Sequence, residues 1–240
     1  MSDWLEIFHK YSSQVGSDYI ASPKALRIIQ KEVDKFVKKN RKESILIIEI
    51  GTGIGTIAEL ITTRVPKVKY FAFERDEYCI EKMKTNLLPK SVTLFTDLNL
   101  LNTAIKEDDS RACFLIVDDF INEFETNSLV QNLKNKSLVV IIEGHRFRQR
   151  IFFTSSLLSL DINFTARFFG NSRDSVKGAF YLKSIDHGSI INKAAMKIIC
   201  RILFARLTIQ SNLYSRKILQ YFGIRKRTIL NYLPRLSKRS

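Results

Sequence analysis

The sequence is poor in cysteine and lacks the features of an exported or membrane-spanning chain. Its three cysteines, Cys79, Cys113 and Cys200, are odd in number and widely spaced, and none forms a C-x-x-C pair. This pattern argues against a disulfide framework or a zinc site and favours a reducing compartment. The start, MSDWLEIFHK, is acidic and amphipathic, unlike a signal peptide. No uncharged apolar run approaches the ~20 residues of a membrane span, so we expect a cytoplasmic protein.

Acidic residues are absent after Asp186, although the whole chain carries a formal net charge of +15. Without the twelve basic residues of this last segment the net charge would be only +3 (15 − 12). The asymmetry separates a basic helical extension over 187–240 from the residues before it. Among those residues, helical spacing of apolar side chains near the start predicts N-terminal helices that form a cap over 1–40, followed by a core domain over 41–186. The twelve residues are Lys193, Lys197, Arg201, Arg206, Arg216, Lys217, Arg225, Lys226, Arg227, Arg235, Lys238 and Arg239.

The basic extension admits three interpretations. Residues 189–210 have the pattern of an amphipathic helix, and a second helix is expected over 214–222. These helices could pack on the body or on a second subunit of a homodimer, attach to an anionic membrane surface, or bind nucleic-acid phosphates. Basic residues alternate here with aliphatic ones, without a cluster of stacking aromatics, which favours peripheral membrane attachment over RNA.

The most informative stretch is Ile45–Thr56, which reads ILIIEIGTGIGT. Its first six residues are apolar except for Glu49, as in a strand buried on both faces. Gly51, Gly53 and Gly55 follow, and the next residues have helical character. Glycine tolerates positive φ and lets a ligand lie against bare backbone. A strand-to-helix turn of this kind is where an open α/β sheet binds its ligand.

The pattern Glu-x-Gly-x-Gly-x-Gly over residues 49–55 resembles motif I of the class I S-adenosylmethionine (SAM)-dependent methyltransferases. A dinucleotide fingerprint would instead require Gly or Ala at position 56, where Thr56 stands. The resemblance continues through the later strands and implies an α/β, Rossmann-like fold. Its seven-stranded sheet is mostly parallel, with helices on both faces and an antiparallel last strand.

The expected elements follow from apolar periodicity and breaks. The last two strands are separated only by GNSRDS, so they are expected to form a hairpin. Strands are expected at 45–50, 68–73, 92–95, 111–117, 137–142, 163–169 and 178–184, and helices at 3–15, 23–39, 54–63, 76–88 and 148–160, with 99–109 either helix or loop. The first helix is expected either to cover the active site as a lid or simply to pack on the body.

The resemblance also implies SAM as the cofactor. Glu74 ends the second strand, where a carboxylate can accept both ribose hydroxyl hydrogens. Asp97 follows the third strand, where the family often has an acidic residue bonded to the adenine amino group. The helix after the glycines favours an anionic group at its start, which suits the methionine carboxylate. The resemblance thus assigns cofactor binding to Glu49, Gly51, Thr52, Gly53, Gly55, Glu74, Arg75, Asp97, Leu98 and Asp118.

Asp118 and Asp119 end the fourth strand, at the family's motif IV position beside the transferred methyl group. A carboxylate there can orient the acceptor, take its proton or hold a metal, and the alternative is a helix cap. His145 is a candidate base because its unperturbed pKa is near neutral, although a lone histidine at a strand end is also typical of a surface residue. The predicted catalytic residues are therefore Asp118, Asp119 and His145.

Glu143, Arg146 and Arg150 are the predicted acceptor-binding residues. Guanidinium groups bind carboxylate or phosphate bidentately, which suits an anionic acceptor, and solvated charge is the alternative. Small-molecule O-methyltransferases of the catechol type, which this chain resembles, hold a divalent cation after the fourth and fifth strands. Their Asp-Asn pair is here Glu143-Gly144, so no metal is expected and Mg²⁺ stays an alternative.

The fourth strand also lacks the Asn-Pro-Pro-Tyr type of tetrapeptide found in many amino-group and base methyltransferases. The expected activity is therefore O-methylation of a small-molecule or glycan-like acceptor, anionic or membrane-linked. An RNA methyltransferase that uses the basic extension and a non-catalytic, cofactor-binding scaffold are the two alternatives.

Overall fold

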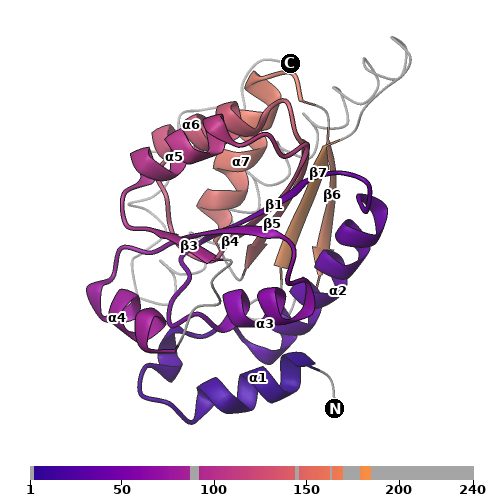
Figure 1. Ribbon diagram of the computed structural model, residues 1–240. Coiled ribbons are helices and arrows are strands. Elements are labelled where there is room, and N and C mark those ends of the chain that lie inside the picture. Colours follow the sequence, from indigo (N-terminus) through magenta and orange to yellow (C-terminus); the bar gives the residue numbers. More distant parts are fainter. Residues whose placement is uncertain (1–2, 87–91, 144–145, 163, 170–178, 185–240) are drawn as a thin grey trace, which may run out of the picture.

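The computed structural model describes residues 3–86, 92–143, 146–162, 164–169 and 179–184 (Figure 1). The predicted basic extension, and His145 among the predicted catalytic residues, lie outside these ranges. The described residues form a seven-stranded sheet with helices on both of its faces. This architecture confirms the fold class that the sequence predicts.

The sheet has the strand order β3-β2-β1-β4-β5-β7-β6. Strands β1 to β5 are parallel to one another, whereas β7 runs antiparallel to both of its neighbours, β5 and β6. The chain therefore ends its sheet with the expected hairpin. The bounds lie within one or two residues of the predicted ones: β1 Ile45–Ile50, β2 Lys69–Phe73, β3 Val92–Phe95, β4 Ala112–Val117, β5 Ser137–Glu143, β6 Phe164–Phe169 and β7 Ala179–Ser184.

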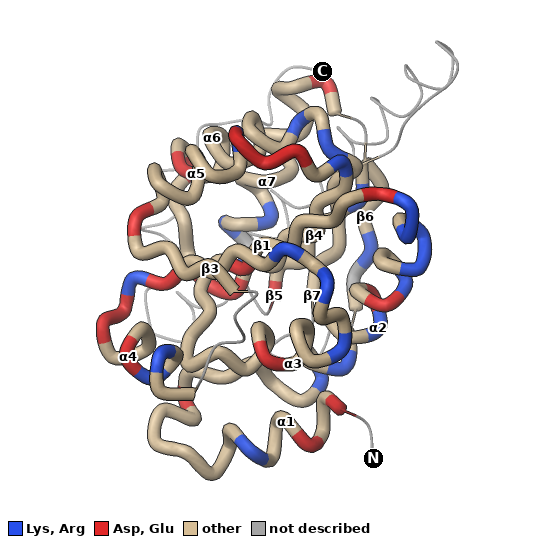
Figure 2. The backbone as a smooth tube through the Cα atoms, in the orientation of Figure 1, with Lys and Arg blue, Asp and Glu red and all other residues tan. Residues whose placement is uncertain are grey.

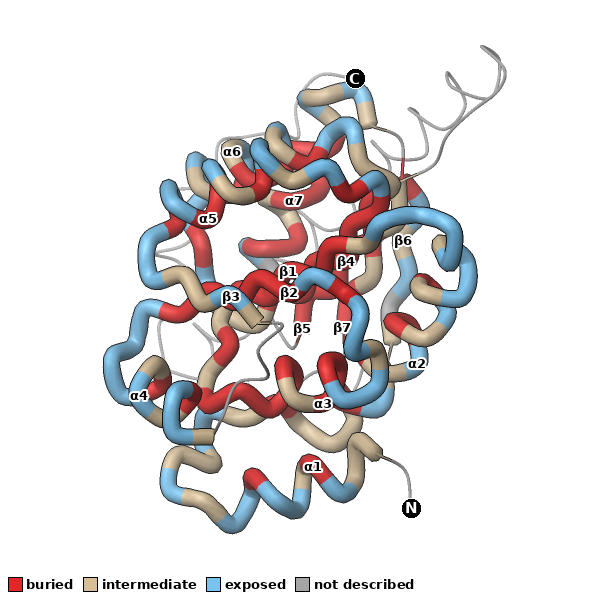
Figure 3. Tube along the Cα trace, in the orientation of Figure 1, coloured by how far each residue is buried: buried red, intermediate tan, exposed pale blue. Residues whose placement is uncertain are grey.

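Alternate residues of the central strands face two separate cores. On β1, Leu46, Ile48 and Ile50 belong to one core, while Ile47 belongs to the other. Both faces are buried, which is why the strand is apolar at nearly every position. Figure 3 shows the buried residues concentrated in the sheet and on the inner sides of the helices. The one charged residue of β1, Glu49, points into the core that contains Ile47, where a carboxyl group needs a hydrogen-bond partner.

The helices cover the sheet in two layers (Figure 1). One layer buries its apolar side chains in the same core as Ile47, and the other in the same core as Leu46. The first consists of α1 Asp3–Ser12, α2 Pro23–Lys39, α3 Thr56–Arg64 and α4 Glu77–Thr85; the second consists of α5 Leu98–Glu107, α6 Glu123–Leu133 and α7 Phe147–Ser159. Because α2 shares a core with the sheet, residues 23–39 pack as part of the body.

Side-chain caps define where several helices begin. Ser22 accepts a hydrogen bond from the Ala25 amide before α2, as its position ahead of Pro23 predicts. Asp97 caps α5, so the stretch 99–109, for which helix and loop were both expected, is mostly helical. The sequence analysis did not predict α6, although Asn122 and Glu125 form a reciprocal capping box at its start.

The N-terminal helix α1 packs on the body instead of covering the sheet edge. Ile7 and Tyr11 are buried, and the Tyr11 hydroxyl donates to Glu59 of α3 at 2.7 Å. Of the two expected roles for this helix, the structure shows the packing one. The short 3₁₀ turn that follows, η1 Ser17–Tyr19, reaches the edge of the sheet in its place.

Within the described ranges, we find no helix that combines the length and the apolar character needed to cross a membrane.

Candidate active site

A cavity of about 640 Å³ lies at the carboxyl ends of β1, β2, β4 and β5. The strand order reverses between β1 and β4, and ligands of open α/β sheets bind at such a switch point. The lining is rich in carboxylates from six different residues. It consists of Asp18, Tyr19, Ile20, Gly51, Gly53, Glu74, Arg75, Asp76, Cys79, Asp118, Asp119, Glu143 and Arg146.

The glycine turn has positive φ at Gly51, Gly53 and Gly55, with values of 81°, 56° and 96°. These angles strain any residue with a side chain, which explains the glycines. A Cβ on Gly51 would overlap the Cβ of Asp119, and one on Gly53 would overlap the carbonyl oxygen of Tyr19. The Cβ positions of these two glycines are thus taken by the protein itself, a correction to the idea that they only make room for a ligand.

Glu74 holds the glycine turn in place. Its carboxylate is 6% exposed and accepts hydrogen bonds from the amides of Gly53 at 2.7 Å, Arg75 at 2.8 Å and Asp76 at 2.9 Å. A carboxylate offers about four acceptor sites, so roughly one remains for a ligand hydroxyl. The predicted bidentate contact with a ribose would require Glu74 to release one of these amides.

Glu49 lies beneath the cavity and does not line it. Its side chain is only 1% exposed and accepts a hydrogen bond from the hydroxyl of Tyr70. Burial raises the pKa of Glu49 well above its usual range, and the Tyr70 hydrogen bond opposes this shift only in part. The structure therefore does not bring Glu49, a predicted cofactor-binding residue, to the cavity; it is a buried carboxyl group near the end of β1 that is bonded to Tyr70.

Asp118, Glu143 and Arg146 form a linked group on one wall. Arg146 contacts Asp118 through a carboxylate oxygen at 3.1 Å and also donates to its backbone carbonyl. Burial raises the pKa of Asp118, an effect that Arg146 and the neighbouring Glu143 oppose. Burial and the charge of Asp118 raise the pKa of Glu143 well above its usual range. Of these two neighbouring carboxyl groups, Glu143 is therefore the one whose protonated form is favoured more strongly.

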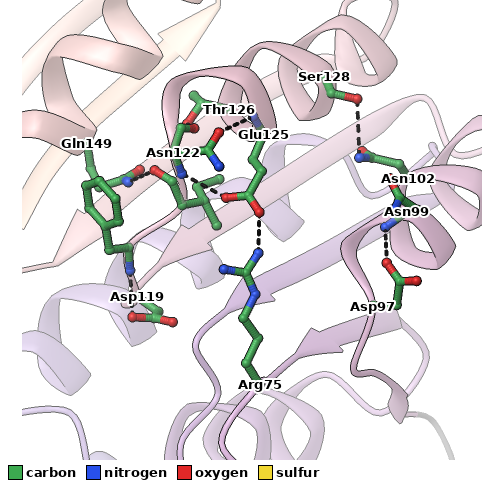
Figure 4. Close-up of polar contacts among 12 residues, drawn as sticks. Arg75, Asp97, Asn99, Asn102, Asp119, Asn122, Glu125, Thr126, Ser128 and Gln149 are labelled. Carbon is green, nitrogen blue, oxygen red and sulfur yellow. Dashed lines mark hydrogen bonds and ion pairs between the residues drawn. The ribbon is translucent and has the colours of Figure 1, made fainter.

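A second cavity of about 370 Å³ adjoins the first through Arg75, which lines both. Asp97 and Leu98 line this second cavity, so the structure places the predicted adenine-binding residues beside the main cavity. Figure 4 shows Arg75 reaching Glu125 at the start of α6, and Asp97 bonded to the backbone of Asn99. Asp97 thus has the helix-capping role in addition to any role toward a ligand.

The remaining predicted residues lie apart from the cavity. Thr52 is buried and its hydroxyl donates to the carbonyl of Phe73 at 3.3 Å. Arg150 is 7% exposed and lies over the ring of Phe180, 5.6 Å from its centroid. Burial lowers the pKa of Arg150 to about 10. The structure therefore does not bring Arg150 to the cavity that Arg146 lines.

Five lining residues were missed by sequence reasoning. Asp76 and Cys79 come from the start of α4, where Asp76 caps the helix and so looks like an ordinary cap. Asp18, Tyr19 and Ile20 come from η1 and its end, and the sequence has no motif there. Their place at the cavity depends on the packing of α1 and α2, which only the fold reveals.

No family model matches the sequence, and no curated protein matches it. Solved structures do match. The O-methyltransferase TomG of Streptomyces achromogenes, in complex with SAM, is 11% identical over 78% of this chain and 91% of that one, with a TM-score of 0.52. Precorrin-6y C5,15-methyltransferase of Geobacter metallireducens is 12% identical over 72% of this chain and 94% of that one, with a TM-score of 0.50. The chain has the class I methyltransferase fold.

The resemblance in sequence to metal-dependent O-methyltransferases would place a cation near Asp118 and Glu143. Burial and the charge of Asp118 raise the pKa of Glu143, which disfavours the ionised form that a cation needs, and Arg146 already pairs with Asp118. Within the ranges that the structure describes, no three His, Cys, Asp or Glu side chains are arranged to hold a metal ion. The residues present do not fit a cation, and we assign no chemical step to one.

Proposed function

We propose that the protein transfers a methyl group from SAM to an acceptor oxygen. The observation that carries the proposal is the single cavity that joins the glycine turn, Glu74 and Asp118 at the reversal of strand order. Its volume of about 640 Å³ lies within the range of ~300–1,000 Å³ typical of small-molecule sites. The methyltransferases that share this fold, one of them in complex with SAM, support methyl transfer from SAM, while the choice of oxygen as acceptor rests on the resemblance in sequence to small-molecule O-methyltransferases.

The residues around the two cavities suit the parts of SAM. Glu74 would hold the ribose, and the second cavity, with Asp97 and Leu98, would take the adenine. The glycine turn and the start of α3 would take the methionine part, since helix N-termini favour anions. When bound, SAM supplies a methyl group already activated by a sulfonium charge.

The protein's own contribution is alignment and proton removal. Holding the acceptor oxygen in line with the methyl group supplies most of the required acceleration. Asp118 is the best candidate base, because burial raises its pKa toward the operating pH while Arg146 keeps it ionised. Glu143, protonated, would donate to Asp118 and keep its reactive oxygen oriented. The acceptor hydroxyl proton would pass to Asp118 as the new carbon–oxygen bond forms.

The charges around the cavity favour a neutral or cationic acceptor over an anionic one. Six lining residues are acidic, and both lining arginines are engaged: Arg75 with Glu125, and Arg146 with Asp118. Guanidinium groups that are already paired offer little to an incoming carboxylate or phosphate. The same surplus of carboxylates would repel the phosphates of RNA, so we place the RNA methyltransferase alternative second.

A methyl-transfer screen with labelled SAM tests the proposal. Fractionated lysate would supply separate lipid, glycan, RNA and small-metabolite pools, with Asp118→Asn as the catalytic control. We expect label in small metabolites or glycans, and a loss of at least ~100-fold in the control. Label confined to RNA would support the alternative activity. Binding of SAM without transfer to any pool would support a non-catalytic scaffold.

A further inference from the structure

A third cavity, with a basic lining, lies at the other end of the sheet. It measures about 510 Å³ and is formed by the C-terminal half of α2 with β5, β7 and β6. We call it the basic groove, because four of its lining residues are Lys35, Lys39, Arg167 and Lys183. Figure 2 shows several basic residues along α2, on the same side of the molecule as β6, whose one basic residue is Arg167.

The strand register explains why these side chains gather. Lys183 of β7 lies between Val139 of β5 and Thr165 of β6, and all three line the groove. Tyr181 and Arg167 form the next such pair, two residues along, so they share the same face. Lys183 is four residues along β7 from Ala179, which pairs in the sheet with Glu143 at the active-site end of β5. At about 3.3 Å per residue the groove is therefore some ~13 Å along the strands from the active-site edge.

Among the described residues, only one carboxylate pairs with a cation of the groove. Lys35 pairs with Glu32 at 2.6 Å, which accounts for the one acidic lining residue. Among the described residues, no carboxylate lies within 4.0 Å of the charged nitrogens of Lys39, Arg167 or Lys183. After Ser184 the sequence has a single acidic side chain, Asp186, which lies outside the described residues.

The groove has an energetic cost in the absence of a ligand. The pKa of Lys183 is lowered, first by partial burial and then by the adjacent ammonium of Lys39 and the charge of Arg167. Lys39 lies in the last turn of α2, where a cation favours the helix dipole. Arg167 and Lys183 lie on strands, and no such structural benefit explains their placement.

We propose that the basic groove binds a phosphate or pyrophosphate group carried by a small ligand. Three cations in one recess, none of them paired with a described carboxylate, suit a group with two or more negative charges better than a single carboxylate. The guanidinium of Arg167 can bind two phosphate oxygens at once, and the ammonium group of each lysine adds a localised positive charge. Ser137 and Thr165, which also line the groove, supply hydroxyl groups beside them. The site is separate from the one that would transfer the methyl group.

Calorimetric titration of the full chain with inorganic pyrophosphate at low salt tests this proposal. The Lys39→Gln/Lys183→Gln variant removes two charges from the groove. The Lys31→Gln/Lys38→Gln variant removes two exposed charges of α2 that do not line it. We expect binding at least ~10-fold weaker in the groove variant and within about twofold of wild type in the control. The wild type and both variants keep the basic C-terminal segment. Any pyrophosphate bound by that segment therefore contributes equally to the three titrations.

Two further measurements keep the proposal open to contradiction. Removing like charges should leave the melting temperature of the groove variant unchanged or raised, so weaker binding would not reflect unfolding. Nitrogen NMR of Lys183 should show its pKa rising when pyrophosphate is added. Equal weakening in the two variants, or no pyrophosphate binding at all, would overturn the proposal. The proposal would also be overturned if the groove variant weakened the binding of a short RNA or of anionic vesicles while pyrophosphate did not bind in the groove.

Discussion

At Gly53 the backbone has a φ of 56°, and the carbonyl oxygen of Tyr19 occupies the place of a Cβ. Gly53→Ala should therefore combine backbone strain with a collision against η1. We expect the free energy of unfolding to fall by ~1–3 kcal/mol and SAM affinity to fall with it. Chemical denaturation and calorimetry measure the two effects.

Gly55→Ala is the matched control for that change. Its φ of 96° imposes a similar strain, but a Cβ there would meet only the side chain of Met83 at 3.6 Å and the Tyr11 hydroxyl at 3.8 Å, both ordinary contacts. The Gly53 variant should be the less stable and the weaker binder of the two. Equal losses would show that the Tyr19 contact contributes nothing.

The buried carboxyl group of Glu49 predicts a pH dependence of stability. Its pKa is raised in the folded protein, so the folded state binds its proton more tightly than the unfolded state does. The resulting stability is fully present below the unfolded pKa, ~4.3, and is lost as the pH rises toward the folded pKa.

Glu49→Gln removes this titration and keeps an oxygen that can accept from Tyr70. We expect the free energy of unfolding to decline less steeply with pH above ~4.3 in the variant than in the wild type. Urea denaturation at a series of pH values measures the slope. Identical slopes in the two proteins would mean that Glu49 titrates normally in the fold.

At the scale of elements, the cap of α5 coincides with the predicted adenine-binding residue. Asp97 accepts from the amide of Asn99 at 2.7 Å and also lines the second cavity. Asp97→Ser keeps a capping oxygen but loses the charged carboxylate. We expect stability within ~0.5 kcal/mol of wild type and weaker SAM binding.

Asn122→Ala is the corresponding control on α6, where it removes half of a capping box. It should lower the free energy of unfolding by ~0.5–2 kcal/mol. Asn122 lines the same cavity, but its side-chain oxygen accepts from the Glu125 amide within α6. A larger loss of SAM affinity in the Asn122 variant than in the Asp97 variant would contradict the adenine assignment.

The elements show where sequence reasoning succeeds. Strands β1 and β4 are apolar runs because both of their faces are buried, and the glycines after β1 need positive φ; both signals are local. The wall made by Asp18, Tyr19 and Ile20 has no local signal, because it depends on how α1 and α2 pack. The hydrogen bond between Glu74 and Gly53 likewise joins residues 21 positions apart, and the one between Arg146 and Asp118 joins residues 28 positions apart. Such contacts become visible only in the fold.

At the scale of the whole molecule, two cavities at opposite ends of the sheet have linings of opposite charge. Six acidic residues line the cavity at the carboxyl edge, and four basic residues line the basic groove. The separation keeps an anionic ligand of the groove away from the site where a sulfonium would bind. A salt titration should therefore weaken pyrophosphate binding more steeply than SAM binding, because SAM buries uncharged parts as well. Parallel salt dependences would contradict this division of charge.

The central claim is that the cavity at the carboxyl edge binds SAM through Glu74, and calorimetry tests it most directly. The three proteins to compare are wild type, Glu74→Gln and Glu77→Gln, whose side chain is exposed on α4 and does not line the cavity. We predict saturable SAM binding to wild type and to Glu77→Gln, and binding weaker by at least ~10-fold in Glu74→Gln, since hydrogen bonds to charged groups contribute about 1.5–3 kcal/mol. No binding to the wild type, or equal binding to all three proteins, would contradict the account.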